Sequence, residues 1–358
     1  MRNILLNPGP VSISEGVRHA MTAVDLCHRE AEYFNLQQQV RSKLNAVYAL
    51  DNADWVPVLL GGSGTTALEA MVSSLLPADA QVLVLENGVY GERLSKLAAI
   101  HGIPNQSIKQ GWKDAWNLER VEAELGSGQY SHVLAVQHET TTGRLNPAGA
   151  LAGLCEKAGV GLFLDTVSSF GAEAIPFASP ALLACAATAN KCLHGVPGAC
   201  MVMARRVALD SAVKPARTMT LDLALWADHQ QRQSTPFTPP VTSLLALNQA
   251  LDELFKTGGQ KGRHAHYLRL ANRVATCLAL LGIHPMLEEG SSSCVLRSYA
   301  LPPRLSYEQL HDGLKLRGFI IYAGQGALAN EMFRISTMGD ISDYDLGRLL
   351  SALEDVIS

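Results

Sequence analysis

The stretch GLFLDTVSSFG, residues 161–171, places an uncharged run directly before an acid and a polar turn. Such a run is typical of a strand that is covered on both faces of a parallel sheet. Ligands in open α/β sheets bind beyond the carboxyl ends of the strands, so Asp165 stands where chemistry normally occurs. Taken alone, Asp165 could equally cap the next helix or bind a metal. No second carboxylate or histidine at ligand spacing supports a metal site there.

Similar apolar runs occur at residues 82–85, 133–136 and 200–203. Stretches with helical spacing of apolar residues lie between them, at 67–75, 94–98, 121–125 and 151–155. Alternating strands and helices predict an α/β domain with a doubly wound, mainly parallel sheet flanked by helices. We assign this large domain to residues 16–260.

The pattern changes after Gly258-Gly259. A long helix-like stretch at about 264–281 is followed by short strand-like and helix-like segments at 294–299, 308–316, 319–322, 333–335 and 344–357. These segments predict a smaller C-terminal α+β domain, residues 261–358. Residues 218–240 are polar and rich in Gln and Pro, and we expect an irregular excursion that lines a site or contacts a partner subunit.

Length and composition limit the class of protein. A chain of 358 residues with 47% hydrophobic and 17% charged residues predicts a globular protein of two domains. The formal net charge of −4 gives no electrostatic reason to expect nucleic acid or an anionic membrane as a partner. Seven cysteines, without a CxxC pair, indicate reduced thiols. The chain has no signal-peptide pattern and no apolar run long enough to span a bilayer, so we expect it in the cytoplasm.

A second motif, LLGGSGTT at residues 59–66, leaves an apolar run and enters a helix. Glycines allow close backbone approach, and the free N–H groups and hydroxyls at a helix start bind anions. The alternative is a Ser or Thr cap after a flexible turn. The motif lacks the Lys-Ser or Lys-Thr of a nucleotide P-loop and the spacing of a dinucleotide fingerprint.

A third motif, AATANKCLHGVPG at residues 186–198, contains a single lysine, Lys191, in an almost uncharged stretch. Apolar surroundings lower the pKa of a lysine and make its neutral amine a nucleophile for an aldehyde. The alternative is a surface lysine with its charged end in water. The three motifs together provide an anion-binding helix start at residues 59–66, which we call the anion cup, an acid at the end of a strand, Asp165, and an amine, Lys191. They match pyridoxal phosphate, which needs a phosphate anchor, a partner for its ring nitrogen and a Schiff-base donor.

With these motifs the chain resembles the class V (fold type I) aminotransferases, and most closely the 2-aminoethylphosphonate–pyruvate transaminases. The likeness covers essentially the whole chain, and the order and spacing of its motifs make it specific. The matching segments are NPGP at 7–10, GSG at 62–64, NGVYG at 87–91, HETTTG at 138–143, DTVSSFG at 165–171, NKC at 190–192, GVPG at 195–198, FT at 237–238 with Pro240, and FRI at 333–335.

The resemblance implies a role for each matching position. Lys191 would form the Schiff base and then act as the proton shuttle, and Asp165 would keep the pyridine nitrogen protonated. Arg334 would grip the carboxylate of the acceptor, and residues 1–15 would lie near the active site. The remaining cofactor contacts would be Ser63, Gly64 and Thr65 at the phosphate, Tyr90 stacked on the ring, Thr140 at its O3′ side, Ser168, and Thr238 from the neighbouring subunit of a homodimer.

The resemblance also implies a reaction. The amino donor 2-aminoethylphosphonate would leave as its aldehyde, and pyruvate would then leave as alanine, in a ping-pong transamination. An alanine–glyoxylate or serine–glyoxylate type of class V enzyme is the alternative, since it would share nearly all these residues. A cysteine desulfurase and a non-catalytic binding protein on the same scaffold are further alternatives, and intact Lys191, Asp165 and Arg334 argue against the latter. We interpret His138 and His194 as hydrogen-bonding scaffold, because Lys191 already serves as the base.

Overall fold

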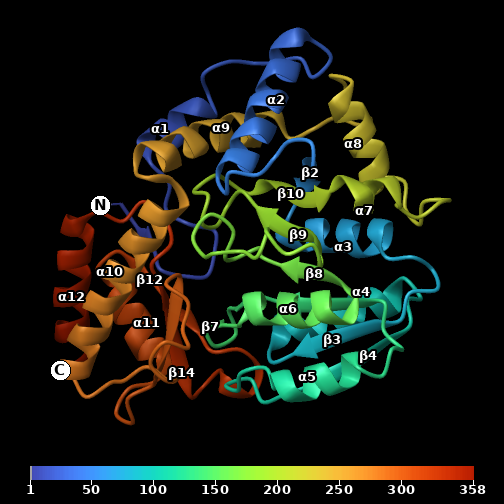
Figure 1. Cartoon of the computed structure of the whole chain (residues 1–358). Helices are drawn as coiled ribbons and strands as arrows, with labels where there is room; N and C mark the ends of the chain where they lie inside the picture. Colours follow the sequence, from blue (N-terminus) through green and yellow to red (C-terminus); the bar gives the residue numbers. More distant parts are fainter. Residues whose placement is uncertain (1) are drawn as a thin grey trace.

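A computed structural model describes residues 2–358 (Figure 1). Its centre is a seven-stranded sheet in the order β2-β10-β9-β8-β5-β3-β4. The strands are β2 (Trp55–Gly62), β3 (Val82–Glu86), β4 (Asn105–Lys109), β5 (His132–Val136), β8 (Gly161–Asp165), β9 (Leu182–Thr188) and β10 (Gly198–Arg205). All four predicted strands are present, and the predicted α/β fold class is confirmed.

The sheet is mixed, because β10 runs antiparallel to both of its neighbours, β2 and β9. The other neighbouring pairs are parallel. Only residues 189–197 separate β9 from β10, and so short a connection joins antiparallel strands, whereas parallel strands need a crossover of a dozen residues or more. The turn that contains Lys191 therefore lies at the end of the sheet where β9 finishes.

Both faces of the sheet are buried, as the uncharged strands predicted. Alternate residues of β5 enter different apolar clusters, with Val133 on one face and Leu134 on the other. Helices cover both faces (Figure 1). The helices that precede the C-terminal part are α1 (Glu15–Ala20), which packs on α9, and α2 (Ala31–Ala46), α3 (Gly64–Leu75), α4 (Val89–Ile100), α5 (Leu118–Leu125), α6 (Ala148–Ala158), α7 (Arg206–Asp210), α8 (Leu223–Gln231) and α9 (Val241–Lys256).

The C-terminal part has its own apolar cluster. The elements of this C-terminal part are α10 (Gly259–Leu280), β11 (Leu296–Ala300), α11 (Tyr307–Leu316), β12 (Phe319–Ile320), β13 (Tyr322–Ala323), β14 (Met332–Ser336) and α12 (Asp343–Ile357). Strand β1 (Ile4–Leu5) pairs in parallel with β12, so the N-terminal segment joins this part of the molecule (Figure 1). The predicted smaller α+β unit is present; the boundaries drawn at 15/16 and 260/261 stay predictions.

The expectation of an irregular excursion at 218–240 needs correction, because helix α8 lies within it. Asp222 starts this helix by accepting from the backbone N–H groups of Ala224 and Leu225. Leu223 and Trp226 are buried against the sheet cluster, which explains why so polar a sequence folds here. No helix within residues 2–358 is long and apolar enough to cross a bilayer.

Candidate active site

The Lys191 turn leaves the sheet at the carboxyl end of β9. The Lys191 side chain is half-buried, and its Nζ has no hydrogen-bond partner among residues 2–358. That nitrogen lies 5.8 Å from the centre of the Tyr90 ring. The aliphatic part of the lysine rests on Gly9, where an added Cβ would lie 3.1 Å from Lys191 Cγ. The N-terminal segment thus contacts the predicted cofactor lysine directly.

Asp165 ends β8, the strand next to β9, and is 4% exposed. Its Oδ1 accepts from the backbone N–H of Val167 at 2.9 Å. Burial raises the pKa of Asp165, while the positive charges of Lys191 and Arg93 act in the opposite direction. The ionised carboxylate is therefore stabilised by any cation that enters beside it.

The predicted anion cup lies at the start of α3. Ser63 is the N-cap residue, and its backbone N–H donates to Thr66 Oγ1 at 3.1 Å. Gly64 must be glycine, because a Cβ there would lie 2.5 Å from the Val167 side chain. Arg93 Nη1 donates to Thr65 Oγ1 at 3.0 Å, which brings a cation to the cup. The anion cup thus includes the guanidinium of Arg93, and through Val167 it contacts the turn that follows Asp165.

Two buried polar atoms near this centre lack a hydrogen-bond partner among the described residues: Thr140 Oγ1 and His138 Nε2. Both belong to the hairpin formed by β6 (His138–Glu139) and β7 (Arg144–Leu145): His138 starts β6, and Thr140 lies in the turn. Burial lowers the pKa of His138 to about 4, and its Nδ1 lies 3.3 Å from the carbonyl oxygen of Ser168. The Ser168 hydroxyl in turn donates to the His138 carbonyl. The imidazole is neutral at neutral pH, as expected for a scaffold residue.

The same hairpin contributes Glu139, a fully buried carboxylate to which the sequence alone assigned no role. Its Oε2 accepts from the backbone N–H groups of Tyr90 and Gly91, and its Oε1 accepts from the N–H and hydroxyl of Thr141. Glu139 thereby caps the N-terminus of α4 from another segment of the chain, where the helix dipole favours a negative charge. Gly88 makes room, since a Cβ there would lie 2.2 Å from Glu139 Cδ.

Arg334, at the centre of β14, reaches from the C-terminal part into this region. Its Nε donates to the carbonyl of Ala323 at 2.9 Å and its Nη1 to the carbonyl of Thr140 at 2.7 Å. The residue is 2% exposed, and Nη2 has no hydrogen-bond partner within residues 2–358. Two carbonyls hold the guanidinium still and leave one nitrogen to donate. Thr238 is exposed and joins none of these groups within its own chain.

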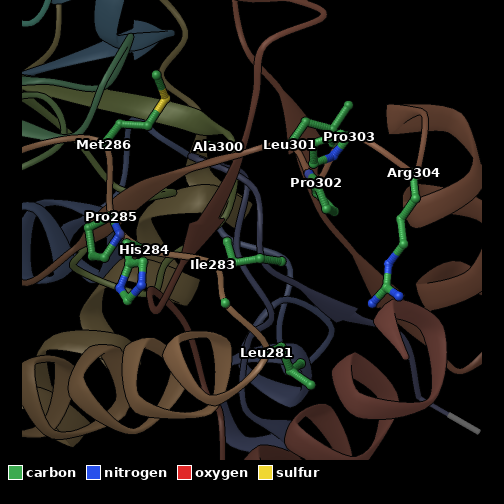
Figure 2. Close-up of a pocket in the computed structure, with 11 residues that line it drawn as sticks. Leu281, Ile283, His284, Pro285, Met286, Ala300, Leu301, Pro302, Pro303 and Arg304 are labelled. Atoms are coloured by element: carbon green, nitrogen blue, oxygen red, sulfur yellow. The ribbon is translucent and has the colours of Figure 1, made fainter.

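A separate surface pocket of about 640 Å³ lies in the C-terminal part, lined by residues 281–286 and 300–304 (Figure 2). Its lining is mostly apolar, and Arg304 donates from its Nη2 to the carbonyl of Ile357. None of the predicted site residues lines it. The chemistry therefore belongs to the cluster around Lys191 and Asp165.

Comparisons with known proteins agree with this arrangement. The Aminotransferase class-V family profile matches residues 15–289. The chain belongs to the class V aminotransferases. A 2-aminoethylphosphonate–pyruvate transaminase of Vibrio vulnificus (strain YJ016) is 34% identical over 98% of this chain and 96% of its own length. One of Bacillus cytotoxicus is 31% identical, with coverage of 98% and 97%.

Solved structures support the same fold. An alanine–glyoxylate aminotransferase from Nostoc superposes with a TM-score of 0.92 and 23% identity over all of this chain and 96% of its own. An aspartate aminotransferase from Thermus thermophilus gives a TM-score of 0.90 and 24% identity, with 99% of both chains covered. This class V aminotransferase is therefore a pyridoxal-phosphate enzyme of fold type I.

The residues around Lys191 and Asp165 fit pyridoxal phosphate. Lys191 offers an unpaired amine, and Asp165 is a buried carboxylate that a protonated ring nitrogen would stabilise. Thr140 offers a buried hydroxyl that has no partner among the described side chains and backbone. The start of α3, with Thr65 and Arg93, offers donors for a phosphate. Which of these groups touches the cofactor, and whether Ser168 does, stays a prediction.

Three residues with contacts at this centre were missed from the sequence: Glu139, Arg93 and Val167. Arg93 lies one turn after Tyr90 on α4, with its Cζ 4.7 Å from the ring centre, so helical spacing could have found it. Glu139 and Val167 lie inside quoted motifs. Their roles depend on contacts between segments distant in sequence, which spacing does not reveal.

We expect Glu139→Gln to weaken cofactor binding and turnover by about tenfold, because an amide nitrogen would replace one carboxylate oxygen, and each of these oxygens accepts two of the four hydrogen bonds. The loosened start of α4 would misplace Tyr90. Titration of the apoenzyme with pyridoxal phosphate, followed by absorbance, measures the first effect. Glu156→Gln, the same change at an exposed position, is the control. Equal affinity and rate in both variants would contradict the role assigned to Glu139.

Proposed function

We propose that this enzyme transfers the amino group of 2-aminoethylphosphonate to pyruvate, giving phosphonoacetaldehyde and L-alanine. The observation that carries the proposal is identity of 31–34% over nearly the full length of relatives with that name. The likeness to alanine–glyoxylate and aspartate aminotransferases is structural and below 25% identity, and it supports the fold alone.

Bound pyridoxal phosphate supplies an aldehyde that takes up amino groups and a ring that withdraws electrons from the carbon losing its proton. Lys191 would hold the cofactor through its amine. When it does not hold the cofactor, Lys191 Nζ would take the proton from the amino-bearing carbon of the donor and give it up again within the site. Asp165 would keep the ring nitrogen protonated through its carboxylate. The donor leaves as its aldehyde before pyruvate enters, so the same residues act twice.

Arg334 is the residue that we propose to bind the anionic end of each substrate. A guanidinium forms strong charge-assisted hydrogen bonds to carboxylate and phosphonate oxygens alike. The carbonyls of Ala323 and Thr140 hold it on one side, so its position does not depend on the substrate. The phosphonate of the donor and the carboxylate of pyruvate would occupy this place in successive halves of the reaction.

We further propose a homodimer in which each chain completes the site of the other. Ser63 at the phosphate cup is exposed in the single chain, and so is Thr238. The loop between α7 and α8 projects from the body of the molecule (Figure 1), and Met219 within it is 75% exposed. The cytoplasm remains the proposed location, in keeping with seven free cysteines.

A donor panel tests the function. We expect 2-aminoethylphosphonate with pyruvate to turn over faster than alanine or serine with glyoxylate, because only the former matches the relatives. Lys191→Ala should lose turnover by several orders of magnitude while still folding. The measurement is alanine formation together with loss of the cofactor's yellow absorbance when donor alone is added. Fast transamination between serine and glyoxylate, without reaction of 2-aminoethylphosphonate, would contradict the proposed substrate. No transamination with any amine would contradict the proposed enzymatic activity.

Arg334→Lys should raise KM for pyruvate by about tenfold or more with a smaller change in kcat, since the single ammonium of lysine cannot replace three separate nitrogens in a planar fork. Steady-state kinetics with varied pyruvate separate the two constants. Arg297→Lys is the matched control, because Arg297 lies on the adjacent strand β11 and bonds to α10 instead. An unchanged KM in Arg334→Lys would place the substrate anion elsewhere.

We expect light scattering to give the molar mass of two chains at micromolar concentration. Mixing Lys191→Ala with Thr238→Ala chains should then restore part of the activity, because half of the sites in a mixed dimer would carry neither change. Both single variants serve as controls. A monomer that is fully active would contradict the shared site.

A further inference from the structure

Three potential metal ligands meet outside the catalytic cluster: Glu173, His264 and Cys294. One ligand atom of each, a carboxylate oxygen, a ring nitrogen and the sulfur, lies within 4.8 Å of the others. They come from the turn after β8, from α10 and from the segment before β11. The cluster therefore spans the contact between the sheet and the C-terminal part. None of the three has a role in the proposed transamination.

The carboxylate of Glu173 is held in a fixed orientation. Its Oε1 accepts from the Ser293 hydroxyl at 2.5 Å and from the backbone N–H of Cys294 at 2.9 Å. Its Oε2 lies 3.3 Å from His264 Nδ1. One oxygen is thus anchored by two donors, and the other faces the imidazole. Hydrogen bonds of this kind orient the carboxylates that bind metals.

The donor set is that of a zinc site. Nitrogen, oxygen and sulfur ligands bind Zn²⁺ at about 2.0–2.3 Å in tetrahedral geometry. Tetrahedral ligands at that range are separated by about 3.5 Å. Glu173 Oε2 and His264 Nδ1, at 3.3 Å, are already that close, and the farthest pair of ligand atoms, within 4.8 Å, would close by about an ångström or less. The His264 side chain is 40% exposed and the Glu173 side chain 3%, so an ion would reach the cluster from the side of His264.

We propose that Glu173, His264 and Cys294 bind one divalent ion of the zinc class, which ties the turn after the Asp165 strand to helix α10. The thiol proton leaves to solvent as the bond from sulfur to metal forms. Burial and the nearby Glu173 raise the pKa of Cys294, so the thiol is neutral in the absence of an ion. The three residues lie too far apart in the chain for ligand spacing to have revealed them. The site does not depend on which amine the enzyme uses.

The test is metal uptake by the holoenzyme. Protein treated with a chelator, with its cofactor retained, is dialysed against micromolar Zn²⁺ and the zinc per chain is measured by mass spectrometry. We expect one equivalent in the wild type and a rise in Tm with zinc. His264→Gln, at a half-exposed position that tolerates the change, should weaken binding by about tenfold or more, as should Cys294→Ser.

Cys277→Ser is the matched control, since Cys277 is another buried cysteine, and it lies on α10 away from the cluster. It should retain full uptake. Zinc held elsewhere, for example by the cofactor, would bind equally to all variants. Equal uptake in His264→Gln and the wild type, or no uptake by the wild type, would show a hydrogen-bonded cluster only and overturn the proposal.

Discussion

A buried carboxylate beside an unpaired amine is the constraint on which this site depends. Asp165 ends β8 opposite Ala186 of the parallel strand β9, and Lys191 follows β9 by a few residues. Parallel neighbours bring their carboxyl ends to one edge, so acid and amine converge without any long loop. Burial destabilises the ionised carboxylate, and Lys191 and Arg93 offset that cost only in part, because the pKa stays raised. A cation bound next to Asp165 would stabilise the ionised carboxylate further, and a protonated pyridine ring provides such a cation.

Glu139, on the β6–β7 hairpin that follows strand β5, extends this constraint to helix α4. By accepting from the backbone of Tyr90 and Gly91 it fixes the first turn of α4, and that turn carries both Tyr90 and Arg93. Arg93 then reaches Thr65 at the start of α3. One carboxylate therefore orients the aromatic ring, and through Arg93 it supports the anion cup. Tyr90 and Arg93 are both only partly buried, so these hydrogen bonds add to the packing that positions them.

The sequence predicted the parts of this arrangement that depend on local pattern. Uncharged strands gave the doubly covered sheet, and the order of cup, acid and lysine gave the cluster around Asp165 and Lys191. Long-range pairing was not predictable in the same way. The antiparallel direction of β10 follows from the short Lys191 turn, and helix α8 forms because Trp226 finds the sheet cluster. Glu139 caps a helix that lies in a different segment, so no spacing within either segment marks it.

The Lys191 turn is also held from the C-terminal part, through His194. This residue adopts a positive φ of 63°, and its Nε2 accepts from the backbone N–H of Gly339 at 3.0 Å and lies 2.5 Å from the hydroxyl of Tyr267. Burial lowers the pKa of His194, so the ring is neutral and Nε2 keeps the lone pair that these contacts require. Asp340, the next residue, donates from its backbone N–H to the carbonyl of Ser12 at 2.8 Å. Because three segments meet at one neutral imidazole, a shift of the C-terminal part moves the lysine turn with it.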